Sequence, residues 1–310
     1  MAGGMVNGAV DPGHYGADPI GSRVGCPGAG ILAYLTRDML HPPMVDDDAM
    51  WADGNRWYDG AAEHVRAVGR MAGLKPGDRV LDIGCGICGP ARLLAREYGA
   101  VVSGVSTSAV HVASAVELNA LGSEAKPSMP GTVSIRLADC QLGLGTAEFD
   151  AAVSINMLYQ VADHRAMYGS VFRALRHGGC LVLDDWMLTP LAGGAELTEL
   201  AEHFQFASFA RTDRVETELL AAGFLPLELV HDFGRVGRLS MTRHFERVMR
   251  EHFAGRVEGD WPVGKEGDPA PPIRGDLLVE HFVAAVNVTL RLYARRCLTY
   301  RRILVRKPEE

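Results

Sequence analysis

The sequence lacks any apolar run close to the roughly 18 residues that a membrane-spanning helix needs. Its N-terminus also lacks the basic segment followed by an apolar segment that marks a secretory leader. Basic residues are few, with 31 Lys and Arg against 38 Asp and Glu, and they are spread along the chain. A surface that binds the phosphate backbone of a nucleic acid needs clustered basic residues. We therefore expect a soluble, cytoplasmic protein without a nucleic acid partner.

Cysteine is also scarce, and only Cys85 and Cys88 among the six cysteines lie close together. A Cys-x-x-Cys pair can form a dithiol centre or half of a zinc site. Zinc needs a second pair of ligands, however, and Cys140 and Cys180 stand alone. Reduced thiols are the expected state in a chain without a leader. We predict no metal site and no disulfide, while a reactive thiol at the start of a helix stays open.

Short apolar strands alternate with amphipathic helices through the middle of the chain. This alternation is typical of a parallel sheet covered by helices on both faces, so the sequence predicts an α/β fold. The length of 310 residues and the apolar content of 47% suffice for one large core. The predicted strands are 79–83, 100–105, 132–138, 149–155, 179–186, 224–233 and 298–307, and the predicted helices are 31–40, 57–74, 90–99, 108–122, 164–178, 194–204, 211–223, 239–253 and 276–296.

A glycine-rich loop, GCGICGP at residues 84–90, joins the first strand to its helix. Glycines let a ligand approach the backbone closely, and the amides at the start of a helix favour a phosphate or a carboxylate. The three glycines fit the G-x-G-x-x-G spacing of dinucleotide-binding enzymes. Those enzymes carry an acidic residue at the end of the second strand, where this sequence has only hydroxyls up to Ser108. The loop therefore indicates a nucleotide-type ligand, with a nicotinamide-dependent oxidoreductase as the disfavoured alternative.

Four stretches resemble class I S-adenosylmethionine-dependent methyltransferases. LDIGCGICGPARLLAREYGAVVSGVSTS is similar to the first motif of the branch that contains sterol, tocopherol and prenyl diphosphate C-methyltransferases and cyclopropane fatty acid synthases. LADCQL, the segment from FDAAVSI to LDDW, and LLAAGFLPLEL resemble later elements of that family. The resemblance covers about Val80 to Asp232 and the closing strand. Cys88 departs from it, because the family has glycine at that position.

The resemblance implies a Rossmann-like fold with a seven-stranded, mostly parallel sheet, helices on both faces and an α-helical lid. It also implies S-adenosyl-L-methionine as cofactor. Residues 1–30 are then a flexible arm, 31–75 an N-terminal helical lid and 76–235 the cofactor-binding core. Residues 236–298 are a helical insertion that covers the substrate and contains a Pro- and Gly-rich loop, and 299–310 are the final core strand and tail.

The family's motifs also assign the cofactor contacts. Asp82 orders the loop amides and the amino group of the cofactor, and Asp139 accepts a hydrogen bond from the adenine amine, beside the backbone amide of Cys140. The side chain of Cys88 must point away from the methionine carboxylate. Ser106 and Thr107 offer hydroxyls to the ribose, and His111 stands where relatives have Gln. The full expected set is Asp82, Gly84, Cys85, Gly86, Ser106, Thr107, His111, Asp139, Cys140 and Asn156.

The acceptor side is less defined. Asn156 and Gln160 are neutral amides where relatives often have Glu and His, so the sequence lacks the expected carboxylate–imidazole pair. Asp184, Asp185 and Trp186 end the predicted fifth strand at the edge where ligands of α/β sheets bind. The candidate catalytic residues are Asp185, His203 and Tyr300, and the candidate substrate contacts are Tyr58, Tyr159, Gln160, Trp186, Phe204 and Phe206.

These features predict a methyltransferase that acts on a small, largely apolar molecule. Carbon of a prenyl, polyketide or aromatic natural product is the first expectation, and oxygen or nitrogen the second. A non-catalytic family member that only binds the cofactor is a further alternative, since Cys88, Asn156 and Gln160 depart from the family pattern. A homo-oligomer is compatible with the sequence.

Overall fold

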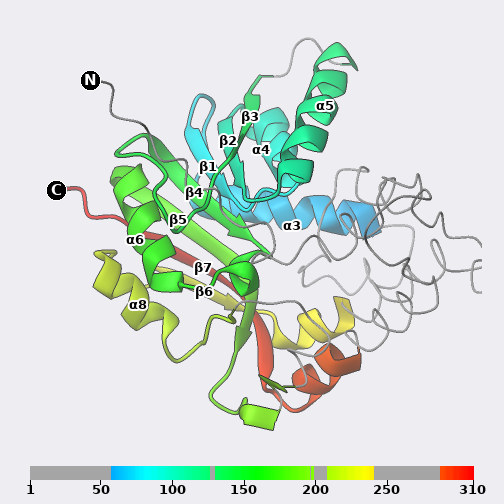
Figure 1. The fold of residues 1–310 in the computed structure, drawn as a ribbon, viewed down its shortest axis with the longest axis vertical. Coiled ribbons are helices and arrows are strands. Elements are labelled where there is room, and N and C mark those ends of the chain that lie inside the picture. The colour runs from blue at the N-terminus through cyan, green and yellow to red at the C-terminus, as the bar shows by residue number, and fades with distance from the viewer. Residues whose placement is uncertain (1–56, 126–129, 196, 199–207, 241–286) are drawn as a thin grey trace, which may run out of the picture.

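A computed structural model describes residues 57–125, 130–195, 197–198, 208–240 and 287–310, and shows one seven-stranded sheet in the order β3-β2-β1-β4-β5-β7-β6 (Figure 1). The strands β1 to β5 run parallel, and β7 is antiparallel to both β5 and β6. The mostly parallel α/β fold expected from the sequence is confirmed. The strands are β1 (Arg79–Ile83), β2 (Val101–Ser106), β3 (Thr132–Leu137), β4 (Phe149–Ile155), β5 (Leu175–Leu188), β6 (Leu229–Asp232) and β7 (Leu298–Arg306).

Helices cover both faces of the sheet (Figure 1). Alternation along each strand sends every second side chain to the opposite face, so Val80 and Val182 pack under α3 and α4, whereas Leu81 and Leu183 pack under α6 and α8. Two apolar cores result, one on each side of the sheet. The helices are α3 (Trp57–Ala72), α4 (Gly89–Tyr98), α5 (Ala109–Ala125), α6 (His164–Ala174) and α8 (Val215–Ala222), with a short 3-10 helix η2 (Leu158–Gln160).

Several predicted boundaries differ in the structure. The helix expected at 164–178 ends at Ala174, because Leu175 has an extended backbone and pairs with Phe149, so β5 starts earlier than expected and also runs on to Leu188. The strand expected at 224–233 is reduced to β6. Pro226 lacks the N–H that a ladder bond needs, although the amides of Leu225 and Glu228 still donate to β7. The expected arm and most of both lid segments lie outside the described residues.

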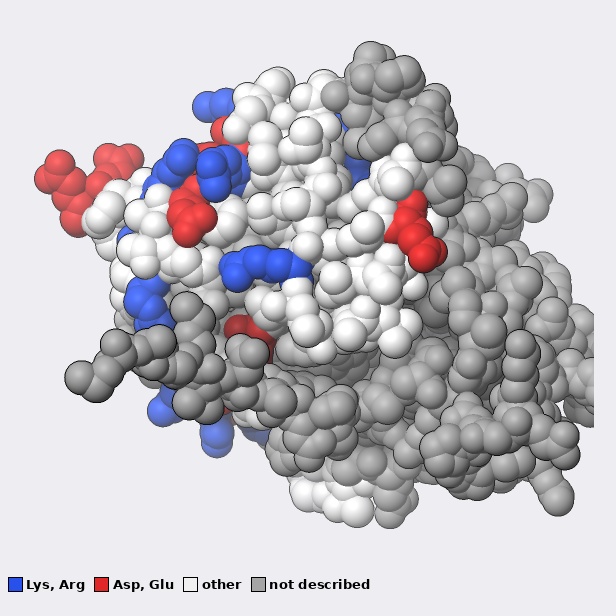
Figure 2. Space-filling view, turned by 45° about the horizontal axis from the view of Figure 1, so that its top comes forward, with Lys and Arg blue, Asp and Glu red and all other residues white. Residues whose placement is uncertain are grey.

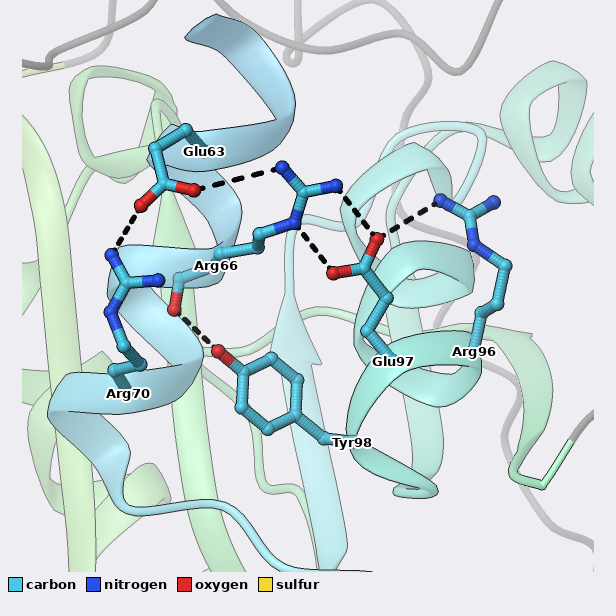
Figure 3. A network of polar contacts seen from close by, with 6 residues as sticks. All are labelled: Glu63, Arg66, Arg70, Arg96, Glu97 and Tyr98. Atoms are coloured by element: carbon cyan, nitrogen blue, oxygen red, sulfur yellow. Dashed lines mark hydrogen bonds and ion pairs between the residues drawn. The ribbon is translucent and has the colours of Figure 1, made fainter. Parts of the chain in front are cut away.

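A polar network joins α3 to α4, the two helices that pack on the same face of the sheet (Figure 3). The Arg66 guanidinium forms two hydrogen bonds with the Glu97 carboxylate, at 2.6 and 3.0 Å, and Glu63 bridges Arg66 to Arg70. The Tyr98 hydroxyl donates to the carbonyl of Arg66 at 2.7 Å. Hydrogen bonding to Arg66 holds the pKa of Glu97 below its ordinary value. The network fixes α3 against the core helix that follows the glycine loop.

Charges of both signs are interspersed on the face shown in Figure 2, where basic and acidic side chains lie beside each other and beside broad uncharged areas. Partly exposed side chains also form ion pairs, such as Arg79–Glu148 and Arg176–Asp150. Within the described residues, no helix is both long and apolar enough to cross a membrane.

Candidate cofactor and acceptor site

The carboxyl ends of β1, β2, β3 and β4 meet at one edge of the sheet, because parallel strands end on the same side. In register, Asp82 lies between Gly104 of β2 and Val153 of β4, and Ser106 lies beside Leu137 of β3. The topology therefore gathers the expected cofactor residues from four strands at one edge. Their individual roles stay predictions.

The glycine loop makes a tight turn with a left-handed backbone at Gly84, Gly86 and Cys88, with φ of 69°, 53° and 64°. Only glycine adopts this conformation without steric cost. Space is also limited at Gly84, because a Cβ there would lie 2.0 Å from Cγ of Met157. Arg92 steadies the turn by donating to the carbonyl of Ile87 at 2.6 Å. The turn thus brings the backbone amides at the start of α4 toward the sheet edge without side chains in the way.

Both cysteines of the loop face the sheet. A Cβ added to Gly104 of β2 would lie 2.6 Å from Sγ of Cys85 and 3.2 Å from Sγ of Cys88, so the two sulfurs pack over this glycine. Cys85 is 6% and Cys88 0% exposed, and neither forms a disulfide. A hydrogen bond with Cys88, then burial, raises the pKa of the Cys85 thiol, which disfavours the reactive thiolate. No cluster of three metal-binding side chains occurs among the described residues.

Two buried polar side chains at this edge lack hydrogen-bond partners among the described residues. Asp82 is 2% exposed and its Oδ2 has none, and burial raises the pKa of this carboxyl to about 7. Asn156 is 6% exposed, and neither its amide nitrogen nor its amide oxygen has a partner. An unpaired buried polar group is costly, by about 1–3 kcal/mol. The carboxyl suits an amino group, and the carboxamide can both donate and accept, so the pair fits the polar amino-acid end of the expected cofactor.

The ends of β2 and β3 carry hydroxyl, imidazole and carboxylate groups. The Ser106 hydroxyl accepts from the amide of Ser108 at 3.2 Å, Thr107 is exposed, and His111 is half-buried on the first turn of α5. Asp139 is half-buried and accepts from the backbone amide of Gln141 at 2.8 Å. Cys140 beside it is buried, and burial raises the pKa of its thiol to about 12.

A buried carboxylate–imidazole pair is present after all, from residues the sequence did not connect. Nε2 of His64 on α3 contacts the Asp184 carboxylate on β5, and Arg302 on β7 contacts the same carboxylate at 3.3 Å. All three side chains are at most 3% exposed. Burial alone would raise the pKa of Asp184, but Arg302 and His64 outweigh it and hold that pKa below its ordinary value. Asp184 therefore binds α3 to the sheet rather than ending its strand toward a cleft.

Asp185 and Tyr300, two of the candidate catalytic residues, are both fully buried. Asp185 accepts from the backbone amides of Met157, Leu158 and Trp186 at 2.5, 2.6 and 2.7 Å. The Tyr300 hydroxyl donates to the backbone carbonyl of Asp184 at 2.9 Å. Both groups thus have intramolecular partners in this structure. Their catalytic roles stay predictions, and the third candidate, His203, lies outside the described residues.

An aromatic cluster, defined as Tyr159, Trp186, Phe209, Tyr293 and Tyr300, lies beside this edge in a separate apolar core. The Tyr159 ring is 5.7 Å from that of Trp186 and stacks at 6.0 Å on Phe209. Gln160 is exposed and donates to the Tyr159 hydroxyl at 3.3 Å. Of the other expected substrate contacts, Tyr58 is in α3 with its side chain outside the description, and Phe204 and Phe206 lie outside the described residues.

Sequence reasoning missed His64, Phe209 and Tyr293. The last two join the aromatic cluster from the segment after β5 and from the helical residues before β7. Their apolar patterns carried no signal beyond core packing. His64 lay on the apolar face of a predicted helix, where an unexplained imidazole was the one hint that a buried acid is nearby.

Comparisons with known proteins agree with this geometry. A family model described as a methyltransferase domain matches residues 81–183. The chain is 30% identical over 160 residues to 2-methyl-6-phytyl-1,4-hydroquinone methyltransferase of Synechocystis sp., covering 51% of this chain and 47% of that protein. It is 29% identical over 241 residues to 27-O-demethylrifamycin SV methyltransferase of Amycolatopsis mediterranei, covering 74% of this chain and 83% of that one. The chain thus spans less than half the length of the Synechocystis relative.

Solved structures share the fold. Geranyl diphosphate C-methyltransferase from Streptomyces coelicolor superposes with a TM-score of 0.62 at 14% identity, covering 82% of this chain and 81% of that chain. The strand order and the glycine turn are consistent with the methyltransferase domain that the family model matches. Residues 81–183 of this chain therefore match a methyltransferase domain in sequence, and the described sheet has the fold of solved methyltransferase structures.

Proposed function

We propose that this chain transfers a methyl group from S-adenosylmethionine to a carbon atom of a small, largely apolar molecule of natural-product biosynthesis. The observation that carries the proposal is the pair of unsatisfied buried groups, Asp82 and Asn156, beside the glycine turn. A buried carboxyl and a buried carboxamide without partners leave hydrogen-bonding capacity that a polar ligand would use. The Synechocystis relative, a hydroquinone methyltransferase by name, supports an apolar acceptor.

The proposed cofactor contacts follow from the position of each group. Asp82 would bind the amino group of the methionine part, and the amides at the start of α4 would bind its carboxylate, because a helix N-terminus favours an anion. Asp139 would accept from the adenine amine. The hydroxyls of Ser106 and Thr107, with the imidazole of His111, would face the ribose. The register of Asp82 and Ser106 near the ends of β1 and β2 supports these assignments, and Thr107, His111 and Asp139 follow the ends of β2 and β3 in the chain.

The proposed acceptor side is the aromatic cluster. Methyl transfer from a sulfonium depends mainly on alignment and on the exclusion of water, so an apolar wall is of more use than a strong acid or base. Tyr159, which packs against Trp186 and Phe209, would supply such a wall together with them. If a carbocation forms at the acceptor, their ring faces would also stabilise it.

The experiment that tests this proposal is a calorimetric titration with S-adenosylhomocysteine and, separately, with NADH. We expect saturable binding of S-adenosylhomocysteine alone, and at least a tenfold loss of affinity in Asp82→Asn. Asp78→Asn is the matched control, because that carboxylate lies at the opposite end of β1 and accepts only from the amide of Lys75 among the described residues. Binding of NADH without binding of S-adenosylhomocysteine would assign the chain to the oxidoreductases instead. Transfer of a labelled methyl group to prenyl, polyketide and aromatic acceptors then identifies the substrate.

A second candidate is O-methylation of a natural product. It is favoured by the alignment with 27-O-demethylrifamycin SV methyltransferase, which covers 83% of that protein. The same cofactor site would serve both reactions. A labelled product whose methyl group is removed by ether cleavage would identify oxygen as the acceptor, whereas a product that keeps it would identify carbon.

A further inference from the structure

The short helix η2 follows β4 directly and has no cap of its own. Its N-cap residue, Met157, makes no side-chain capping bond. The first amides of a helix need an acceptor from elsewhere when no local side chain supplies one. Asp185 of β5 supplies it, since its Oδ2 accepts from the amides of Met157 and Leu158. Its Oδ1 accepts from the amide of Trp186. A fully buried carboxylate from another strand therefore caps η2.

The capped segment touches both halves of the site. Met157 packs against Gly84 so closely that a Cβ on this glycine would meet its side chain. Two residues later, Tyr159 packs against Trp186 and Phe209 of the aromatic cluster. Asn156, with its unpaired carboxamide, precedes the cap. This one segment thus contacts the glycine turn at one end and the aromatic cluster at the other.

We propose that Asp185 is a positioning residue that holds the segment 156–160 between the glycine turn and the aromatic cluster, and so aligns cofactor and acceptor. The inference rests on the proposed function for the alignment, although the capping itself does not depend on it. In this role Asp185 removes no proton from the acceptor. Its three short hydrogen bonds all come from backbone amides, which is the arrangement of a cap.

The charge around Asp185 is compatible with this role. Asp184 is its neighbour on the strand, and burial, with the charge of Asp185 as a lesser cause, raises the pKa of the phenols of Tyr168, Tyr293 and Tyr300. Burial raises the pKa of Asp185 to about 7, although the three amides act in the opposite direction. Protonation would turn one oxygen into a donor and weaken the cap.

The test uses the full chain and the variant Asp185→Asn, which replaces one acceptor oxygen by a donor at the same volume. Hydrogen–deuterium exchange of the peptide that contains residues 156–160 should become at least tenfold faster, while a peptide from β1 is unchanged. The affinity for S-adenosylhomocysteine should fall about tenfold. Asp150→Asn is the control, because this carboxylate also accepts a backbone amide, from Arg79 at 2.8 Å, at the other end of the sheet.

Exchange and affinity equal to those of the wild type, with loss of turnover alone, would overturn the proposal and make Asp185 a base. If Asp185→Asn does not fold, Asp185→Glu tests the same cap. This variant keeps the carboxylate but adds a methylene at a fully buried position, which moves the carboxylate relative to the amides it caps. We expect faster exchange in this variant too, and unchanged exchange would contradict the proposal. The exchange measurement needs no cofactor, so it stays informative if the wild-type chain does not bind S-adenosylhomocysteine and the proposed function fails.

Discussion

Replacing Gly84 by alanine should damage the glycine turn in two separable ways. The first is backbone strain, since φ is 69° and an L-residue in the left-handed region costs about 1–2 kcal/mol. The second is overlap, because the new Cβ would lie 2.0 Å from Cγ and 2.9 Å from Cβ of Met157. Overpacking of this kind costs about 1–3 kcal/mol. Together they predict that Gly84→Ala lowers the free energy of unfolding by about 2–5 kcal/mol.

Gly73→Ala provides the matched control. Gly73 has nearly the same φ, 66°, but nothing lies within 4 Å of the position its Cβ would take. Its substitution should therefore cost only the backbone part, about 1–2 kcal/mol. Urea denaturation of both variants measures the difference, and calorimetry should show weaker binding of S-adenosylhomocysteine for Gly84→Ala alone.

A double-mutant cycle with Met157→Ala tests the overlap directly. Removing Cγ and Sδ of Met157 should reduce the cost of Gly84→Ala toward that of Gly73→Ala. If Gly84→Ala is no more destabilising than Gly73→Ala, or if its cost is the same with and without the Met157 side chain, the close approach of these two segments is refuted.

Four further outcomes are expected. Gly104→Ala should destabilise the chain by about 1–3 kcal/mol because of overlap with Sγ of Cys85, and Cys85→Ala should reduce that cost in a double-mutant cycle. Burial raises the folded-state pKa of Asp82 from 3.8 to about 7, so the stability that protonated Asp82 contributes should be lost as the pH rises from about 4 to 7. In urea titrations the free energy of unfolding of the wild type should fall over this range by up to about 1.4 kcal/mol per pH unit more than that of Asp82→Asn. An equal slope in both proteins would contradict the shift. Asp184→Asn should cost about 3–5 kcal/mol by leaving His64 and Arg302 buried without their carboxylate, and a loss below about 1 kcal/mol would refute this central role. Arg66→Lys should cost at most about 1 kcal/mol and the loss should shrink in high salt, because the pair with Glu97 is partly exposed.

Local patterns were sufficient to predict the α/β core. The apolar strands, the glycine turn and the hydroxyl-rich end of β2 are signals confined to a few neighbouring residues, and each lies where expected. The boundaries that moved depend on pairing with distant residues. Leu175 leaves α6 because it meets Phe149.

The buried polar contacts could not be predicted in the same way. Asp184 and Asp185 look equivalent in sequence, yet alternation along β5 turns them to opposite faces of the sheet. Asp184 then meets His64 and Arg302, and Asp185 meets the amides at the start of η2. Partners this far apart in the chain leave no local pattern.

The measurement that tests the central claim most directly is a crystal structure of the chain with bound S-adenosylhomocysteine. We predict its amino-acid end against Asp82, Asn156 and the amides of the glycine turn, and its adenine amine within hydrogen-bonding distance of Asp139. A ligand bound elsewhere, or an Asp139 carboxylate turned away from the base, would contradict the assignment of this sheet edge as the cofactor site.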